Sequence, residues 1–304
     1  MRWTRRGGAL LVLAAPIAAC RAERRPTDTT SVSQPIDPAK PLVGLKPEGI
    51  TIPQSPESIA YNGLRMSLNE GATALDGGDL AAAGDALSRA RAGYEGQLAS
   101  PTRGADPDLH DRLLKSYDVM GGAVREGDGG TYRYHRYFAD VGVLRLATLR
   151  IRAALGKGEA TEGERWFSVI ANRFDLAKDV QPVGAAWKRV QSGPVDATTR
   201  KVVDLTLGAY LATKVRAELK GAVAGLDEQN KAKARWEVAG GIAYHDAVKE
   251  VFQQQLGVEG ARRLAETIQG VDAAIEQGDE ARARGLIEQA NAQLDAFDRT
   301  VAAG

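Results

Sequence analysis

The chain has little of what most catalytic and metal-binding motifs are built from. Its 304 residues include one cysteine and three histidines, and aromatic residues make up 6% of the total. A single cysteine has no partner for a disulfide within the chain. The sequence also lacks an HExxH or CxxC motif, a glycine-rich phosphate loop and a serine-centred nucleophile elbow. We therefore expect neither a hydrolase nor a nucleotide-binding enzyme, and an enzymatic role of any kind is the less favoured prediction.

Charge is balanced over the whole chain, and long apolar runs are lacking after residue 20. Lysine and arginine number 40 against 39 acidic residues, so the net charge is +1. This balance lacks the basic excess of nucleic-acid-binding domains, and we expect no nucleic-acid partner. After residue 20 no apolar run approaches the about 20 residues that a membrane span needs. Abundant alanine, leucine, glutamate and arginine favour helix over sheet.

The first 20 residues have the organisation of an export signal. Three arginines precede an apolar stretch, residues 9–19, that is too short to cross a bilayer. The run from Ile17 to Cys20 resembles the lipobox of bacterial lipoproteins. That resemblance implies removal of residues 1–19 and a diacylglyceryl group on Cys20, which would anchor the protein to the cell envelope. The alternatives are an ordinary signal peptide and, from Arg5-Arg6, export by the twin-arginine route.

The next segment is predicted to be a tether. Seven of the 12 prolines lie between residues 21 and 56, and no apolar periodicity is sustained there. We interpret residues 20–55 as a lipidated cysteine followed by a disordered, proline-rich linker. Fully extended, such a linker would reach on the order of 100 Å. Residues 56–304 are then one all-α domain, or two packed halves of about 56–130 and 131–304.

Helical signals continue from Pro56 to the end of the chain. Ser55 precedes a proline at the first helical position, which is the pattern of a helix N-cap. Apolar residues recur at intervals of three and four in 203–223, 264–275 and 283–297. We predict an all-α helical bundle of about eight to ten mostly antiparallel helices.

Four corners repeat one short pattern, in which alanine and an aliphatic residue are followed, after two more residues, by glycine and an acid. A glycine in the left-handed region ends a helix, and the acid then caps the next one. The pattern predicts helix pairs with tight turns. Its copies are Ala74-Leu75 with Gly78-Asp79, Ala123-Val124 with Gly127-Asp128, Ala154-Leu155 with Gly158-Glu159, and Ala274-Ile275 with Gly278-Asp279.

An aromatic cluster at residues 132–138 contains Tyr134 and His135. The helix that follows is apolar on nearly all sides, which is typical of a central, buried helix. His135, Arg145 and Arg152 fall within roughly one third of its circumference. Because buried arginines must be paired, these residues form either ion pairs with neighbouring helices or a polar pocket inside the bundle.

A second tyrosine–histidine pair occurs at Tyr244-His245, and it raises the alternative that the chain contains an internal duplication. On a helical wheel His245 lies opposite the apolar face, and Glu237, Gly241 and His245 step by four along that side. This side either presents a carboxylate and an imidazole to a ligand or faces solvent. His110 lies in the first turn of a helix, and we expect it at the surface.

The helical pattern of residues 78–128 resembles a known kind of domain. It runs from Gly78-Asp79 through an alanine-rich helix and Tyr94-Glu95 to an acidic-leucine helix and Gly127-Asp128. In this it resembles the extracytoplasmic helical domains of bacterial iron permeases and of imelysin-like iron-uptake lipoproteins. The permease motif Arg-Glu-x-x-Glu and the imelysin motif His-x-x-Glu are both absent. The resemblance implies Glu95 and an inward-facing histidine as positions to test.

These features leave three functional classes. The leading one is a lipid-anchored envelope protein that binds or handles iron or copper, metals that accept imidazole ligands. The second is a non-catalytic interaction subunit with protein partners in an envelope or surface-layer assembly. The third is a redox metalloenzyme such as a copper-dependent superoxide dismutase. The candidate metal ligands are His135, His245, Tyr134, Tyr244, Glu95 and Glu237.

Overall fold

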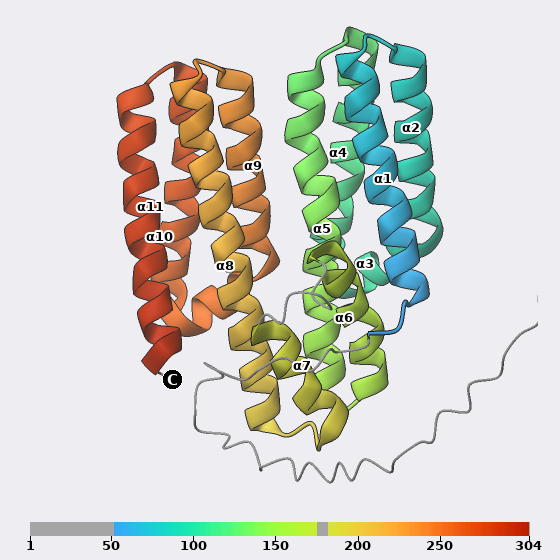
Figure 1. The fold of residues 1–304 in the computed structure, drawn as a ribbon, viewed down its shortest axis with the longest axis vertical. Coiled ribbons are helices and arrows are strands. Elements are labelled where there is room, and N and C mark those ends of the chain that lie inside the picture. The colour runs from blue at the N-terminus through green and yellow to red at the C-terminus, as the bar shows by residue number, and fades with distance from the viewer. Residues whose placement is uncertain (1–51, 175–181, 304) are drawn as a thin grey trace, which may run out of the picture. The chain divides into compact units, whose positions relative to one another are not determined.

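The computed structural model describes residues 52–174 and 182–303, which belong to one compact unit of residues 40–304 (Figure 1). These residues form helices and contain no strand, so the predicted all-α class is confirmed. Cys20 and almost all of the predicted tether lie outside the described residues. The helices are α1 (Pro56–Asp76), α2 (Leu80–Gly93), the π-helix η1 (Tyr94–Leu98), α3 (Ala99–Ala105), α4 (Pro107–Glu126), α5 (Gly129–Gly156), α6 (Ala160–Phe174), α7 (Pro182–Ser192), α8 (Ala197–Asp227), α9 (Lys231–Ala247), α10 (Lys249–Gln277) and α11 (Glu280–Ala303).

The predicted corners are present. Gly78, Gly127, Gly158 and Gly278 all have φ between 69° and 77°, the left-handed region in which glycine is favoured. Beyond three of these glycines, an aspartate side chain accepts a hydrogen bond from the first turn of the next helix; these residues are Asp79, Asp128 and Asp279. The helix pairs α1–α2, α4–α5 and α10–α11 are therefore joined by turns of a few residues.

The first helix begins where the sequence indicates. Ser55 caps α1 by accepting a hydrogen bond from Ser58 N at 3.1 Å, and Pro56 occupies the first helical position. Ser55 is also buried, and its hydroxyl lies 2.7 Å from Ser168 Oγ of α6. The residue just before the domain is thus attached to its core.

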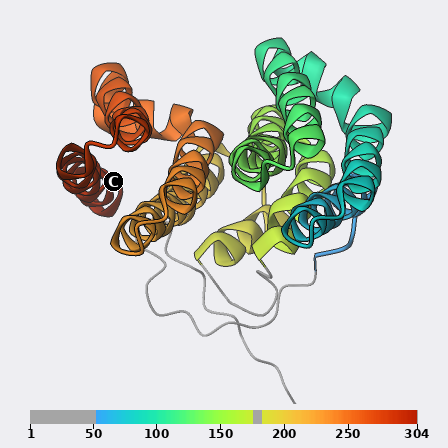
Figure 2. The same cartoon turned by 90° about the horizontal axis from the view of Figure 1, so that it is seen from above.

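Helix α5 is the central element of the domain. Its side chains are buried on several sides, because it packs against α1, α3, α4, α6, α8 and α9. Figures 1 and 2 show α1–α6 grouped on one side and α8–α11 on the other, with α5 and α9 adjacent where the groups meet. The boundary near residue 130 suggested for two halves falls at the turn between α4 and α5, and that division stays a prediction.

Candidate functional site

A cavity of about 730 Å³ opens between α4, α5, α9 and α10. Apolar side chains form part of its wall, among them Leu113 of α4, Phe138 of α5 and Ile268 of α10. Helix α10 bends beside it, because Gly257 has φ 73° and ψ 162° and interrupts the helix there. A volume of this size falls within the about 300–1,000 Å³ that is typical of small-molecule sites.

Two of the three histidines face this cavity, His135 from α5 and His245 from α9. His245 is only 6% exposed, which corrects the expectation that it could lie on a solvated face. Its ring stacks on Phe252 with 4.9 Å between centroids. Nδ1 of His135 and Nε2 of His245 are buried and have no hydrogen-bond partner among the described residues. Buried polar atoms are normally satisfied, and these two nitrogens are among several buried side-chain atoms of the described residues that have no partner.

The surroundings keep both imidazoles neutral. Burial lowers the pKa of His245 to about 4, and Lys249 adds to this while Asp246 opposes it. Burial also lowers the pKa of His135, and Lys115 contributes to that shift. A neutral imidazole has a lone pair on one ring nitrogen, which is the form that binds metals. Both histidines are therefore in the protonation state that a metal ligand requires.

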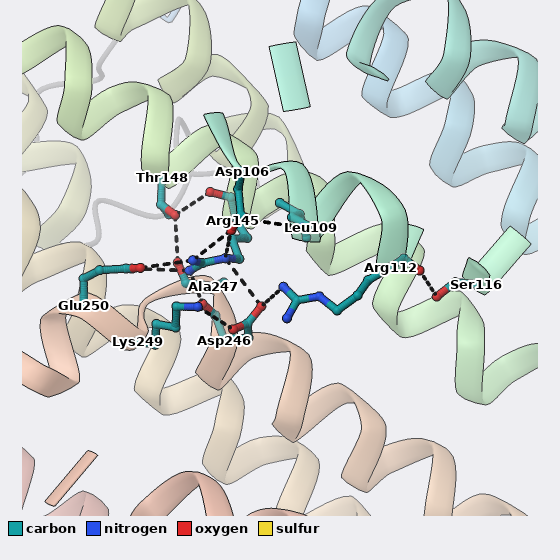
Figure 3. A network of polar contacts seen from close by, with 10 residues as sticks. All are labelled: Asp106, Leu109, Arg112, Ser116, Arg145, Thr148, Asp246, Ala247, Lys249 and Glu250. Atoms are coloured by element: carbon teal, nitrogen blue, oxygen red, sulfur yellow. Dashed lines mark hydrogen bonds and ion pairs between the residues drawn. The ribbon is translucent and has the colours of Figure 1, made fainter. Parts of the chain in front are cut away.

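Arg145 of α5 forms a buried ion-pair network at the edge of the cavity (Figure 3). Its side chain is 3% exposed and lies 3.0 Å from Glu250 and 3.2 Å from Asp106. It also donates a hydrogen bond of 2.6 Å to the backbone oxygen of Asp246, whose carboxylate pairs with Arg112 at 3.0 Å. One guanidinium thus joins the start of α4 to the α9–α10 junction.

Arg152 lies beside this network, near Glu250, and does not line the cavity. It pairs with Asp204 of α8 at 3.4 Å and approaches Glu250 at 3.9 Å. Of the two alternatives drawn from the sequence, ion pairing therefore applies to both arginines and the pocket to Arg145 alone. Arg152 makes ion pairs with neighbouring helices, whereas Arg145 makes ion pairs and also lines a pocket.

A second polar network is buried between α1, α5, α6 and α9, and Tyr244 belongs to it. Tyr61 Oη donates to Asp140 Oδ1 at 2.6 Å, and Arg173 Nη2 lies 3.3 Å from Asp140 Oδ2. Arg173 also donates to Tyr244 Oη at 3.3 Å. Adjacent residues on a helix point about 100° apart, so Tyr244 faces this network while His245 faces the cavity.

Glu237 of α9 forms a carboxyl pair with Glu218 of α8. Each carboxyl group lies over a glycine of the opposite helix: a Cβ added to Gly221 would come 2.6 Å from Glu237 Oε2, and one added to Gly240 would come 2.7 Å from Glu218 Oε2. Tyr137 of α5 lies over Gly240 beside Glu218. Two carboxylates this close disfavour ionisation of both at once. Burial, and then Glu237, raise the pKa of Glu218 to about 8.

The sequence interpretation missed Glu218 and Tyr137, although a signal was present. Glu-x-x-Gly occurs once on each of two consecutive helices, at Glu218–Gly221 and Glu237–Gly240. In an antiparallel hairpin these two copies face one another, because each glycine makes room for the other helix's carboxyl group.

Two further predictions differ from what the structure contains. Glu95 lies on η1, is 49% exposed and pairs with Arg91 at 2.8 Å, so it takes no part in the cavity. His110 is 4% exposed rather than at the surface. Its Nδ1 lies 2.7 Å from Tyr94 Oη, and Arg103 Nη2 donates to its Nε2 at 3.0 Å. Helix α3 and η1 cover this first turn of α4, which a single-helix pattern does not reveal.

Of the six candidate ligands, the structure brings Tyr134, His135 and His245 to one cavity. Tyr134 Oη already donates to Asp272 at 2.9 Å. Within residues 52–174 and 182–303, no three histidine, cysteine, aspartate or glutamate side chains gather closely enough to hold a metal ion. Every helix in these ranges is too short or too polar to cross a membrane.

Comparison with known proteins identifies the family. The family described as Iron permease FTR1 N-terminal domain matches residues 57–293, more than three quarters of the chain. The chain belongs to this family. No curated protein and no solved structure gives a significant match.

The FTR1 N-terminal domain match extends from α1 into α11, so it includes the cavity and both polar networks. It confirms the resemblance to iron-permease helical domains that the pattern of residues 78–128 indicates, and it extends that resemblance over the whole helical domain. The imelysin resemblance gains no such support. The chain therefore contains an all-α domain of an iron-related family.

Proposed function

We propose that this protein is a lipid-anchored component of the bacterial cell envelope that binds iron in the cavity between α4, α5, α9 and α10. The observation that carries the proposal is the pair of neutral imidazoles that line one cavity, the half-buried His135 and the buried His245, each with an unbonded ring nitrogen. Imidazole suits both iron and copper. Membership of a family named for iron permeases favours iron.

Iron analysis of the full chain, purified without an affinity tag, tests the proposal. The wild type should retain iron after dialysis, and titration should show saturable binding. His135→Ala and His245→Leu should each weaken binding at least about tenfold, since removal of even the residues that orient metal ligands typically weakens binding by about 10–100-fold. Leucine keeps the volume of His245 and replaces an unbonded nitrogen with carbon, so this variant should stay folded.

The third histidine provides a matched control. Both ring nitrogens of His110 have partners, and it does not line the cavity. His110→Gln should therefore bind iron like the wild type. Unchanged binding by both cavity variants, or equal loss in the control, would contradict the site. A wild type that binds no iron would contradict the function and favour the interaction-subunit alternative.

The membrane anchor is the second part of the proposal, and it rests on the lipobox-like run that ends at Cys20. One lipid chain binds membranes only weakly, so a stable anchor requires the two acyl chains of a diacylglyceryl group. Cys20→Ala should release the protein into the soluble fraction or leave an unprocessed precursor. Fractionation and the mass of the mature N-terminus measure this result. Wild-type processing and membrane association of the variant would disprove the anchor.

A further inference from the structure

The structure describes two of the chain's methionines, and their surroundings are opposite. Met66 lies on α1 and Met120 on α4. Met120 is 0% exposed in the helical core, whereas Met66 is 59% exposed. Few large apolar side chains in the described ranges are exposed to this degree; besides Met66 they are Ile59, Leu80 and Val258. One thioether side chain is therefore open to solutes in water, and the other is closed off from them.

Met66 points away from the core of the domain. It lies two residues from both Leu64 and Leu68, which are buried, and is therefore about 160° around the helix from each of them. Long helical side chains lean over the preceding turn, where Gly63 has no side chain to cover the thioether. A Cβ added to Gly63 would face open space. The thioether is thus accessible from solution.

A peroxide oxidises an accessible thioether by transferring one oxygen atom. With hydrogen peroxide, the O–O bond breaks, one oxygen bonds to the methionine sulfur, and the other leaves with both protons as water. The sulfur loses two electrons and the peroxide gains them. The product, methionine sulfoxide, is polar and disrupts a core that has to contain it. At Met66 the sulfoxide oxygen would lie in water, whereas at Met120 it would be buried among apolar side chains.

We propose that Met66 is a peroxide-reactive site on the surface of the domain, at which peroxides are reduced as the thioether becomes a sulfoxide and the fold is kept. The site does not depend on the proposed iron binding, since Met66 does not line the cavity. Ile59 lies seven residues away on the same face of α1, so oxidation makes polar one of the two large apolar side chains exposed there. Methionine sulfoxide can be reduced enzymatically, so the reaction is reversible.

Treatment of the full chain with hydrogen peroxide, followed by mass mapping of its peptides, tests the proposal. The Met66 peptide should gain one oxygen atom at least about tenfold faster than the Met120 peptide, because Met120 reacts only when the fold opens. The protein oxidised at Met66 alone should keep its helical circular dichroism and its urea midpoint. Met66→Leu should remove the fast reaction. Met120→Leu is the matched control, a volume-conserving exchange that should leave the fast reaction unchanged.

Three results would overturn the proposal. The first is oxidation of Met120 as fast as Met66 in the folded protein. The second is an unreacted Met66 in a solution where free methionine is oxidised. The third is a lower urea midpoint after oxidation of Met66 alone, because the sulfoxide would then disturb packing instead of lying in water. The wild-type measurements decide all three, so the proposal stays testable even where a variant fails to fold.

Discussion

Replacing Arg145 with methionine is expected to lower the free energy of unfolding by about 3 kcal/mol, the lower end of the range for breaking a buried ion pair. The substitution removes a guanidinium that is 3% exposed and leaves the carboxylates of Asp106, Asp246 and Glu250 without it. These acids are 18–30% exposed, so water partly compensates them. Urea denaturation followed by circular dichroism measures the loss.

Arg262 provides the matched comparison. It also pairs with two acids, Glu259 and Glu266, but it is 55% exposed and its partners lie on the same helix. Arg262→Met should therefore change stability by less than about 1 kcal/mol. Arg145→Lys should fall between the two, since an ammonium keeps the charge and loses the planar fork. Equal, small losses in both methionine variants would show that the Arg145 network adds little to stability.

Glu218→Gln is expected to make the protein more stable at alkaline pH. The folded state binds the Glu218 proton more tightly than the unfolded chain, because its pKa is raised from 4.5 to about 8. Its contribution is thus fully present below about pH 4.5 and is lost as the pH rises toward about 8. Glutamine keeps a hydrogen-bond donor beside Glu237 at every pH. The variant should exceed the wild type by at least about 1.4 kcal/mol at pH 9, the equivalent of one pKa unit.

Chemical denaturation from pH 5 to pH 9 measures this difference. Glu288→Gln, at an exposed position of α11, should show no comparable trend with pH. Because every other titrating group is common to both proteins, the difference between variant and wild type isolates the carboxyl pair. A difference that does not depend on pH would mean that both carboxyl groups are ionised in the folded protein.

The sequence predicted the helical elements well because their signals are local. A glycine followed by aspartate ends one helix and caps the next within a few residues, and the φ values of Gly78, Gly127 and Gly278 confirm this at three such corners. The unusually apolar segment after His135 likewise became the central helix α5, since a helix with neighbours on all sides needs apolar residues on all sides.

The environments of individual histidines could not be predicted in the same way. A helical wheel assumes one buried face, whereas α9 packs against α5, α8 and α10. His245 lies opposite the apolar stripe and is nevertheless buried, because α5 and α10 cover that side too. The acid pair was missed for a related reason, because Glu218 and Glu237 meet only when the two helices pack as a hairpin. In the sequence alone, the glycines that make room for them are simply residues of low helix propensity.

The tight corners also bear on how this domain folds. Hairpins such as α8–α9 and α10–α11 close short loops, which loses little entropy, so they can form early. The contact between Arg145 and Asp246 joins residues 101 positions apart, so closing that separation loses more entropy than closing a hairpin. The cavity lies at that same meeting of α5 with α9, so it exists only when these two helices have docked. A ligand bound there would hold the two hairpin groups together and slow their separation.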